Sequence, residues 1–360
     1  MNSKERVLRT FERREADRVP INYHSNPGID GRLKAHFGLK PDDYEGLRQK
    51  LGVDLVGLGA PYTGKILHAE KQDRRVEPQW GWVKKYVEHE SGGYWDYCEF
   101  PLIEADFDSV DKWPMPSPDD YDYSTIAKDC RKFGDYAVYV GGPGLACIIN
   151  TAGFLRGMEQ VFVYLELDEP AGLRLVDRML AIQLEVTRRS IEAAEGGIDF
   201  MWIGEDLGTQ KGPIISMEMF QKHIKPRHKP FFDLARQYSL PVMIHTCGSS
   251  SWAYDDYIEM GLTVADTLQP EAKDMSPEYL KKTFGDRLAF HGCISTAGPV
   301  AYGTAEETAA YCRRTLEIMM PGGGYCFSPT HQLQDNSPTE NVVAMYATAR
   351  ECGGYDPAKR

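Results

Sequence analysis

The sequence lacks the features that would place this protein in a membrane or on nucleic acid. No apolar run approaches the roughly 18 residues that a membrane-spanning helix needs. The chain begins with a charged stretch, Met1 to Arg6, instead of an apolar secretory signal. Lys and Arg number 41 against 53 Asp and Glu, and the net charge of −12 argues against sequence-independent binding to nucleic acid or anionic lipid. We therefore expect a cytoplasmic protein without a nucleic-acid or membrane partner.

Cysteine is also scarce. Eight Cys in 360 residues do not form the dense spacing of a disulfide-stapled domain. This usage is typical of a reducing compartment, where thiols are free or bound to metal. The sequence also contains no low-complexity segment and no short-period repeat.

A regular alternation of strands and helices is present. Apolar, β-rich runs bounded by Gly, Pro or polar residues recur about eight times, and nearly every one is followed by a helical pattern. We expect strands at 18–24, 54–58, 136–140, 198–203, 241–247, 263–268, 287–291 and 324–327. This pattern predicts an α/β protein, a single (β/α)8 TIM-barrel domain over residues 1–360, with a doubly wound sheet as the alternative.

Residues 60–118 interrupt the alternation. They are rich in Trp, Tyr, Pro and charge, and a Ser-Gly-Gly sequence at 91–93 separates two alternating runs. We expect an antiparallel hairpin inserted after the second strand as a lid over the barrel mouth. Its aromatic residues either line a ligand pocket or pack on one another; they are Trp80, Trp82, Tyr94 and Trp95.

His245 and Cys247 are the strongest candidates for chemistry. They close the run Pro241-Val-Met-Ile-His-Thr-Cys-Gly248. Side chains two residues apart in a strand leave the same face, so the imidazole and the thiol form half of a zinc site. The alternative from this run alone is a buried thiol beside a hydrogen-bonded histidine.

The other ligands should come from neighbouring strand ends, because the active sites of TIM barrels lie at the C-terminal ends of their strands. Cys326 completes a His/Cys/Cys set with an open position, the arrangement of catalytic zinc sites. His291-Gly-Cys293 repeats the H-x-C pattern, so Cys293 is an alternative to Cys326.

Several polar residues near these ends are further candidates. Glu205 is either a displaceable ligand or acid/base group, or it accepts hydrogen bonds from loop amides. Gln269 and His331 are candidates for binding the cofactor or orienting a ligand, and the alternative for His331 is that it satisfies loop backbone.

Three stretches carry a resemblance to a known family. They are Gly204-Glu-Asp-Leu-Gly-Thr-Gln-Lys-Gly-Pro, His245-Thr-Cys-Gly-Ser249, and Pro321-Gly-Gly-Gly-Tyr-Cys-Phe-Ser-Pro-Thr-His-Gln-Leu-Gln334 followed by Pro338-Thr-Glu-Asn341. The chain resembles the uroporphyrinogen decarboxylase superfamily over nearly its whole length. That resemblance implies one TIM barrel.

Two branches of that superfamily differ in their motifs. The decarboxylases carry an Arg-Gln-Ala-Gly-Arg stretch that binds tetrapyrrole carboxylates, and residues 22–32 here contain no such stretch. The corrinoid-dependent methyltransferases carry H-x-C followed far downstream by Cys, which His245, Cys247 and Cys326 match. The resemblance demotes Cys293, which falls where relatives usually have Asn or Gly.

The resemblance to that branch implies an enzyme, a zinc-dependent methyltransferase. It would move a methyl group between a small O-methyl, N-methyl or thiol compound and the cobalt of a corrinoid (cobalamin) carried by a partner protein. Catalysis would involve Glu205, His245 and Cys247. The alternatives are a metal-independent decarboxylase and a non-catalytic corrinoid- or metal-binding module. Relatives are often homodimers, but these residues decide neither the oligomeric state nor the direction of transfer.

Overall fold

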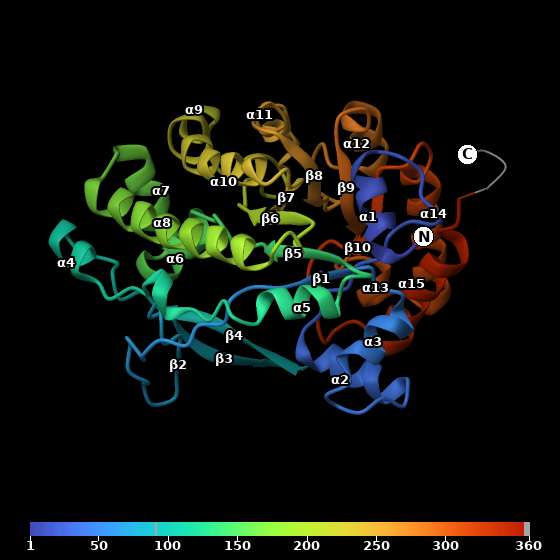
Figure 1. The fold of residues 1–360 in the computed structure, drawn as a ribbon, viewed down its shortest axis with the longest axis horizontal. Coiled ribbons are helices and arrows are strands. Elements are labelled where there is room, and N and C mark those ends of the chain that lie inside the picture. Colours follow the sequence, from blue (N-terminus) through green and yellow to red (C-terminus); the bar gives the residue numbers. More distant parts are fainter. Residues whose placement is uncertain (91, 356–360) are drawn as a thin grey trace.

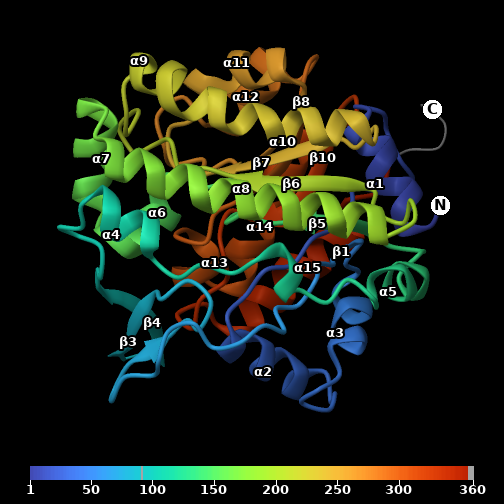
Figure 2. The same ribbon diagram turned by 60° about the vertical axis from the view of Figure 1, so that its left-hand side comes forward.

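The computed structural model describes residues 1–90 and 92–355. A parallel sheet of seven strands curls into a barrel, and its strand order follows the chain. Helices cover its outer surface (Figures 1 and 2). The strands are β1 (Leu55–Gly57), β5 (Ala137–Gly141), β6 (Phe200–Gly204), β7 (Val242–Thr246), β8 (Leu262–Thr267), β9 (Ala289–Ile294) and β10 (Tyr325–Pro329).

A short extended segment closes the ring between β10 and β1. Phe327 N donates to Pro20 O at 2.8 Å and Asn22 N donates to Phe327 O at 2.9 Å, while Asp54 N donates to Ile21 O at 2.8 Å. The prediction of a full strand over 18–24 is wrong, since this segment makes only two isolated bridges, one between Arg18 and Gly354 and one between Ile21 and Phe327. Pro20 has no N–H to donate, which limits the ladder here.

The helices follow the strands as the alternation predicts. They include α3 (Tyr44–Leu51), α5 (Ile126–Lys132), α6 (Ile149–Arg156), α7 (Met158–Leu167), α8 (Pro170–Ala193), α10 (Lys225–Gln237), α11 (Tyr254–Met260), α12 (Pro277–Phe284), α14 (Ala305–Met319) and α15 (Thr339–Cys352). The remaining elements are α1 (Ser3–Phe11), α2 (Pro27–His36), α4 (Phe107–Lys112), α9 (Met217–Met219), α13 (Pro299–Tyr302), the 3-10 turns η1 (Pro118–Asp120) and η3 (Ser251–Ala253), and the π-helical η2 (Phe220–Ile224).

Helix caps show where local sequence rules hold and where they fail. The sequence Thr-Ala-Glu-Glu at 304–307 predicts a capping box, and Thr304 and Glu307 form one at the start of α14. The same pattern at Ser337 and Glu340 does not form. Helix α15 begins only at Thr339, and the Ser337 hydroxyl is buried without a hydrogen-bond partner.

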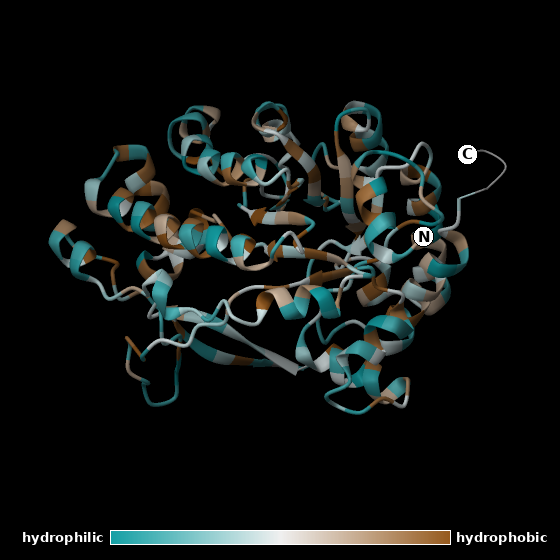
Figure 3. Ribbon diagram, in the orientation of Figure 1, coloured by the Kyte–Doolittle hydropathy of each residue, from teal (hydrophilic) through white to brown (hydrophobic). Residues whose placement is uncertain are grey.

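The barrel interior is divided into two layers. The layer nearer the N-terminal strand ends, called here the apolar layer, includes Val7 and Phe11 of α1, so that this helix closes the barrel floor. Its other members come mainly from the strands, and they are Leu55, Ala137, Phe200, Trp202, Met243, Val264, Ala289 and Cys326. Figure 3 shows the strands as largely hydrophobic and the outer helices as alternating between hydrophobic and hydrophilic.

The insertion forms a second, antiparallel sheet. Its strands are β2 (Arg75–Val76), β3 (Val83–His89) and β4 (Gly92–Glu99). In both ribbon views β3 and β4 lie on the side away from α1, towards the barrel mouth (Figures 1 and 2). Tyr97 of β4 stacks on Phe154 of α6 with ring centroids 3.5 Å apart. Ser91, in the predicted turn, lies outside the described residues.

These observations confirm the predicted TIM-barrel fold with an antiparallel insertion after the second strand. Among the described helices, none combines the length and apolar character needed to cross a membrane.

Candidate metal centre

Three side chains from two neighbouring strand ends converge at the barrel mouth. His245 is the second-to-last residue of β7, Cys247 directly follows that strand, and Asp206 lies in the loop after β6. One ligand atom from each lies within 4.8 Å of the other two, and among the described residues no other group of three His, Cys, Asp or Glu side chains does this. We call these three residues the metal cluster.

The distances within the metal cluster can be compared with zinc geometry. Cys247 Sγ lies 3.4 Å from His245 Nε2. Zn–N and Zn–S bonds of about 2.0 and 2.3 Å at a tetrahedral angle separate the two ligand atoms by about 3.5 Å. Asp206 Oδ1 lies 3.9 Å from His245 Nε2, against about 3.4 Å for a bound carboxylate oxygen. The imidazole and thiol therefore already have the spacing of ligands, and the carboxylate is within a small movement of it.

The His245 ring is oriented by the next strand. Asp266 faces it in the β7–β8 register, and Asp266 Oδ2 accepts from His245 Nδ1 at 2.9 Å. A carboxylate can only accept, so Nδ1 carries the proton and Nε2 is the nitrogen directed at the metal cluster. Burial alone would lower the pKa of His245, but the contacts with Asp266 and Cys247 together outweigh it and raise that pKa well above its ordinary value. This carboxylate–imidazole pairing is typical of metal-binding histidines.

Two tightly crossed loops hold Asp206 beside Cys247. A Cβ on Gly208 would lie 2.3 Å from Ser249 N, and one on Gly248 would lie 2.3 Å from Gly208 O. Only glycine permits this approach, and Gly248 also has a positive φ of 70°. Across the crossing, Cys247 N donates to Asp206 Oδ1 at 3.1 Å.

The second carboxylate oxygen of Asp206 is fixed from α6. It accepts from Asn150 Nδ2 at 2.7 Å. Burial would raise the pKa of Asp206, but the proximity of His245 and these hydrogen bonds lower it below its usual range. Asp206 is therefore held ionised and in one orientation.

A chain of hydrogen bonds continues from Asp266 across the barrel. Asp266 Oδ1 accepts from His291 Nδ1 at 2.5 Å. Asn22 Nδ2 lies 2.9 Å from Nε2 of His291 and 2.9 Å from Nε2 of His24. We call these residues, with His245, the polar layer. It lies above the apolar layer and pairs the charge of the buried Asp266.

A cavity of about 260 Å³ borders the metal cluster. We call it the metal-side cavity. It is lined by His24, Pro143, Trp202, His245, Asp266, Pro329, Thr330, His331 and Gln332. It is large enough for a small ring compound.

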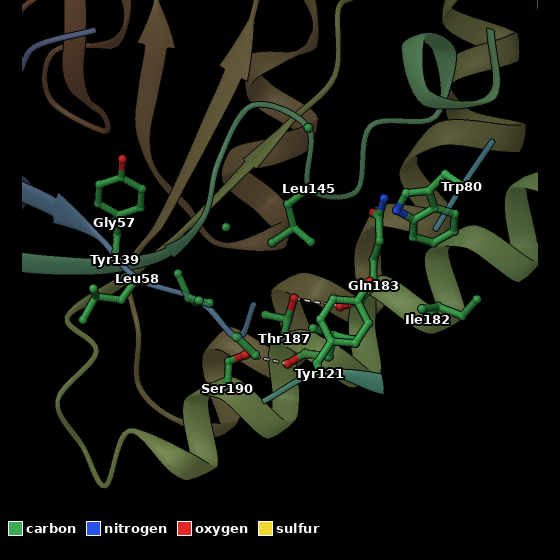
Figure 4. Close-up of a pocket in the computed structure, with 16 residues that line it drawn as sticks. Gly57, Leu58, Trp80, Tyr121, Tyr139, Leu145, Ile182, Gln183, Thr187 and Ser190 are labelled. Carbon is green, nitrogen blue, oxygen red and sulfur yellow. Dashed lines mark hydrogen bonds between the residues drawn. The ribbon is translucent and has the colours of Figure 1, made fainter. Parts of the chain in front are cut away.

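A larger cavity of about 520 Å³ lies nearby and includes Trp80 of the insertion, Tyr121 just after it and Gln183 of α8 (Figure 4). It contains no residue of the metal cluster. The loop after β5 divides the two cavities, because Pro143 lines the smaller one and Gly144 lines the larger. Of the predicted pocket aromatics, Trp80 lines the larger cavity and also stacks on Trp82, whereas Tyr94 and Trp95 are exposed.

Cys326 does not join the metal cluster. The structure places this thiol in the second position of β10, opposite His291, where it is fully buried in the apolar layer. The strand continues to Pro329, so the residue that reaches the mouth from this strand is His331 and not Cys326. The structure therefore does not bring the predicted third ligand, Cys326, to His245 and Cys247, and it places Asp206 beside them instead. Cys293 is also buried, in the core outside the barrel interior.

Glu205 faces away from the metal cluster. Its carboxylate is fully buried and accepts from Ile148 N at 2.7 Å, Ile149 N at 3.0 Å and Cys147 Sγ at 3.5 Å. It therefore accepts from amides at the start of α6 and lies outside the metal cluster, contrary to the expectation that it belongs to that site. Of the two readings left open by the sequence, the amide-accepting one is found.

Gln269 and His331 occupy different places. Gln269 Oε1 accepts from Gly248 N at 2.7 Å and so braces the loop that carries Cys247. His331 is exposed and lines the metal-side cavity opposite His245. Of these two residues, His331 lines the cavity and can contact a bound molecule, whereas Gln269 does not line it.

Sequence reasoning did not name Asp266, and it named Glu205 where the structure places the neighbouring Asp206 in the metal cluster. Asp266 carried a signal, since a lone carboxylate inside an apolar strand must find buried partners. Adjacent residues on a loop carry no comparable signal, because their directions depend on the backbone turn after β6.

Comparisons with known proteins agree with this architecture. A family model described as uroporphyrinogen decarboxylase (URO-D) matches residues 136–352, more than half of the chain. No curated protein matches the sequence significantly. Among solved structures, a methyltransferase from Methanosarcina mazei is similar, with a TM-score of 0.62 and 17% sequence identity, over 98% of this chain and 99% of that chain. At that identity the likeness establishes the fold.

Proposed function

This chain belongs to the uroporphyrinogen decarboxylase family, and we propose that it is a zinc-dependent methyltransferase within it. The enzyme moves a methyl group between a small O-methyl, N-methyl or thiol compound and the cobalt of a corrinoid held by a partner protein. The resemblance of its motifs to the corrinoid-dependent branch supports the partner, and the methyltransferase among similar folds is consistent with it.

One observation carries the proposal: the metal cluster opens onto a cavity, and its imidazole is already oriented by Asp266. Nitrogen, thiolate and carboxylate donors suit zinc, and three protein ligands leave a fourth position for substrate. His245, Cys247 and Asp206 would hold the ion. When bound, zinc supplies a Lewis acid for a methylated heteroatom or lowers the pKa of a substrate thiol.

The chain's own residues prepare this site in defined ways. Asp266 holds one proton of His245 on Nδ1, so the proton on Nε2 is the one that the ion displaces. Burial raises the pKa of Cys247, so the thiol must lose its proton when the ion binds. Asp206, fixed by Asn150 and the Cys247 amide, brings the second negative charge.

The chemistry balances without a further reagent. In demethylation, the bond between the methyl carbon and the heteroatom breaks and the heteroatom keeps the electron pair. The two electrons of the new bond to carbon would come from a corrinoid in the cobalt(I) state. Methylation of a thiol is the reverse displacement, with the substrate sulfur as nucleophile.

A decarboxylase of the tetrapyrrole type fits the cavity poorly. Several substrate carboxylates would need Arg or Lys partners. The described residues that line the metal-side cavity include neither.

The proposal is tested by incubating zinc-loaded protein with methylcobalamin and a thiol, and separately with chemically reduced cobalamin and a methyl ether or methylamine. We expect interconversion of methylated and unmethylated cobalamin, visible in its absorbance, that is lost in Cys247→Ala and kept in the matched Cys293→Ala. Zinc-independent turnover, or turnover that survives in Cys247→Ala, would refute the proposal.

A further inference from the structure

Asn22 fixes the proton positions of two histidines. Its Oδ1 accepts from Tyr23 N at 2.9 Å, and because a backbone N–H can only donate, the amide orientation is determined. The two hydrogens of Nδ2 are then directed at Nε2 of His24 and Nε2 of His291, each 2.9 Å away. Both Nε2 atoms must accept. His291 accordingly donates from Nδ1 to Asp266.

The same reasoning leaves His24 with its proton on Nδ1. Among the described residues no partner accepts from that nitrogen, and it is not among the buried polar atoms that lack a partner, so it reaches open space. The ring borders the metal-side cavity and an adjoining cavity of about 240 Å³. Burial, followed by the nearness of His291, lowers the pKa of His24 to about 4. At neutral pH it is therefore an uncharged donor.

The surroundings of His24 restrict what it can bind. Trp202 lies beside it with ring centroids 5.1 Å apart, and the Nε1 atom of Trp202 is buried without a partner among the described residues. In the metal-side cavity an anion would find no Lys or Arg among the described lining residues, since Arg48 lines only the adjoining cavity. A methylated ammonium group would face the N–H of His24, and the one carboxylate that lines this cavity, Asp266, is already bonded to His245 and His291. An uncharged oxygen can accept the hydrogen bond that His24 offers, and an apolar group next to that oxygen can pack against the Trp202 ring.

We propose that His24 is a specificity-determining residue that donates a hydrogen bond from Nδ1 to the oxygen of an uncharged methyl ether. This inference rests on the proposed methyl transfer and narrows its substrate class to O-methyl compounds of small size, such as methoxybenzenes. Asn22 is a positioning residue in this account, because it acts by holding the tautomer of His24.

The test compares two ligands of equal shape on three proteins. Methoxybenzene and ethylbenzene differ in the ether oxygen, and their Kd values are measured by ligand-observed NMR on zinc-loaded wild type, His24→Leu and His24→Asn. Loss of one neutral hydrogen bond corresponds to a factor of about 3 to 10. We expect wild type to prefer methoxybenzene by that factor, His24→Leu to lose the preference, and His24→Asn, whose amide places an N–H near the former Nδ1, to keep most of it.

Three results would overturn the inference. They are a preference that persists in His24→Leu, tighter binding of tetramethylammonium than of methoxybenzene, and an Nε2-protonated His24 in the 15N NMR spectrum of the wild-type imidazoles. The last measurement does not depend on any variant folding. Zinc is counted in the same samples, and His24 is not a ligand in the proposed site. Absence of zinc in wild type would therefore refute the proposed function, while the ether preference would still report on His24.

Discussion

The two layers of the barrel interior put the same residue types to opposite uses. Met243 and His245 are two residues apart on β7 and face the same side, yet one packs in the apolar layer and the other begins the polar layer. The two thiols differ in the same way. Cys326 lies among apolar side chains, whereas Cys247 lies 3.4 Å from an imidazole. The position of a cysteine along its strand therefore decides whether its thiol lies beside other candidate ligands at the barrel mouth.

The layers also differ in how they handle charge. In the polar layer, Asp266 is buried but bonded to two histidines, which together outweigh burial and lower its pKa. In the apolar layer the Cys326 thiol has no such partners, and burial raises its pKa well above the ordinary value. A thiol that stays protonated is a poor ligand.

Among the substitutions that distinguish the two layers, Asp266→Asn should have the largest effect. It removes the carboxylate that orients His245, and loss of such a partner typically lowers metal affinity about 10- to 100-fold. We also expect about 3 kcal/mol lower free energy of unfolding, because two buried imidazoles lose their charged partner. Competition with a zinc chelator and urea unfolding measure the two effects. Unchanged zinc affinity would show that Asp266 does not support the metal cluster.

Glu205→Gln sharpens the contrast between adjacent carboxylates. The amide cannot accept all three hydrogen bonds that Glu205 accepts, so we expect about 2 kcal/mol lower free energy of unfolding. Zinc content should not change, whereas Asp206→Asn should reduce it. Urea unfolding and metal analysis on both variants test this, and zinc loss in Glu205→Gln alone would reverse the two assignments.

Cys326→Ser probes the apolar layer. A hydroxyl buried there without a partner should lower the free energy of unfolding by about 1 to 2 kcal/mol. In the zinc-free protein, Cys247→Ser at the partly exposed mouth should lower the free energy of unfolding by a smaller amount. Equal costs measured by urea unfolding would mean that the two environments do not differ as described.

Below the apolar layer, Asp17 gives the smallest expected effect. Its carboxylate accepts from Arg6 Nε at 2.7 Å, and this bond outweighs partial burial and lowers the pKa of Asp17. The resulting stabilisation is present above the unfolded-state pKa of about 3.9 and is lost as pH falls through the lower folded-state value. Asp17→Asn should cost less than about 1 kcal/mol at pH 7. The difference in free energy of unfolding between wild type and Asp17→Asn should shrink as the pH is lowered in urea unfolding. A difference that grows towards low pH would contradict the predicted direction.

The fold was predictable because it rests on patterns repeated along the chain. Strand–helix alternation gave the barrel, and the Thr304 capping box gave the start of α14. His245 and Cys247 were predictable as neighbours because strand geometry fixes residues two apart. The position of Cys326 along β10 was not, because a two-residue difference in where the strand ends moves a side chain between layers. Asp266 and Asn22 act through contacts between strands, which local patterns do not encode.

The most direct test of the account is the zinc content of three purified proteins, kept reduced throughout: wild type, Cys247→Ser and Cys326→Ser. The account predicts about one zinc per chain in wild type and in Cys326→Ser, and little in Cys247→Ser. Zinc lost from Cys326→Ser and retained by Cys247→Ser would contradict it, because the metal would then depend on the apolar layer instead of the barrel mouth.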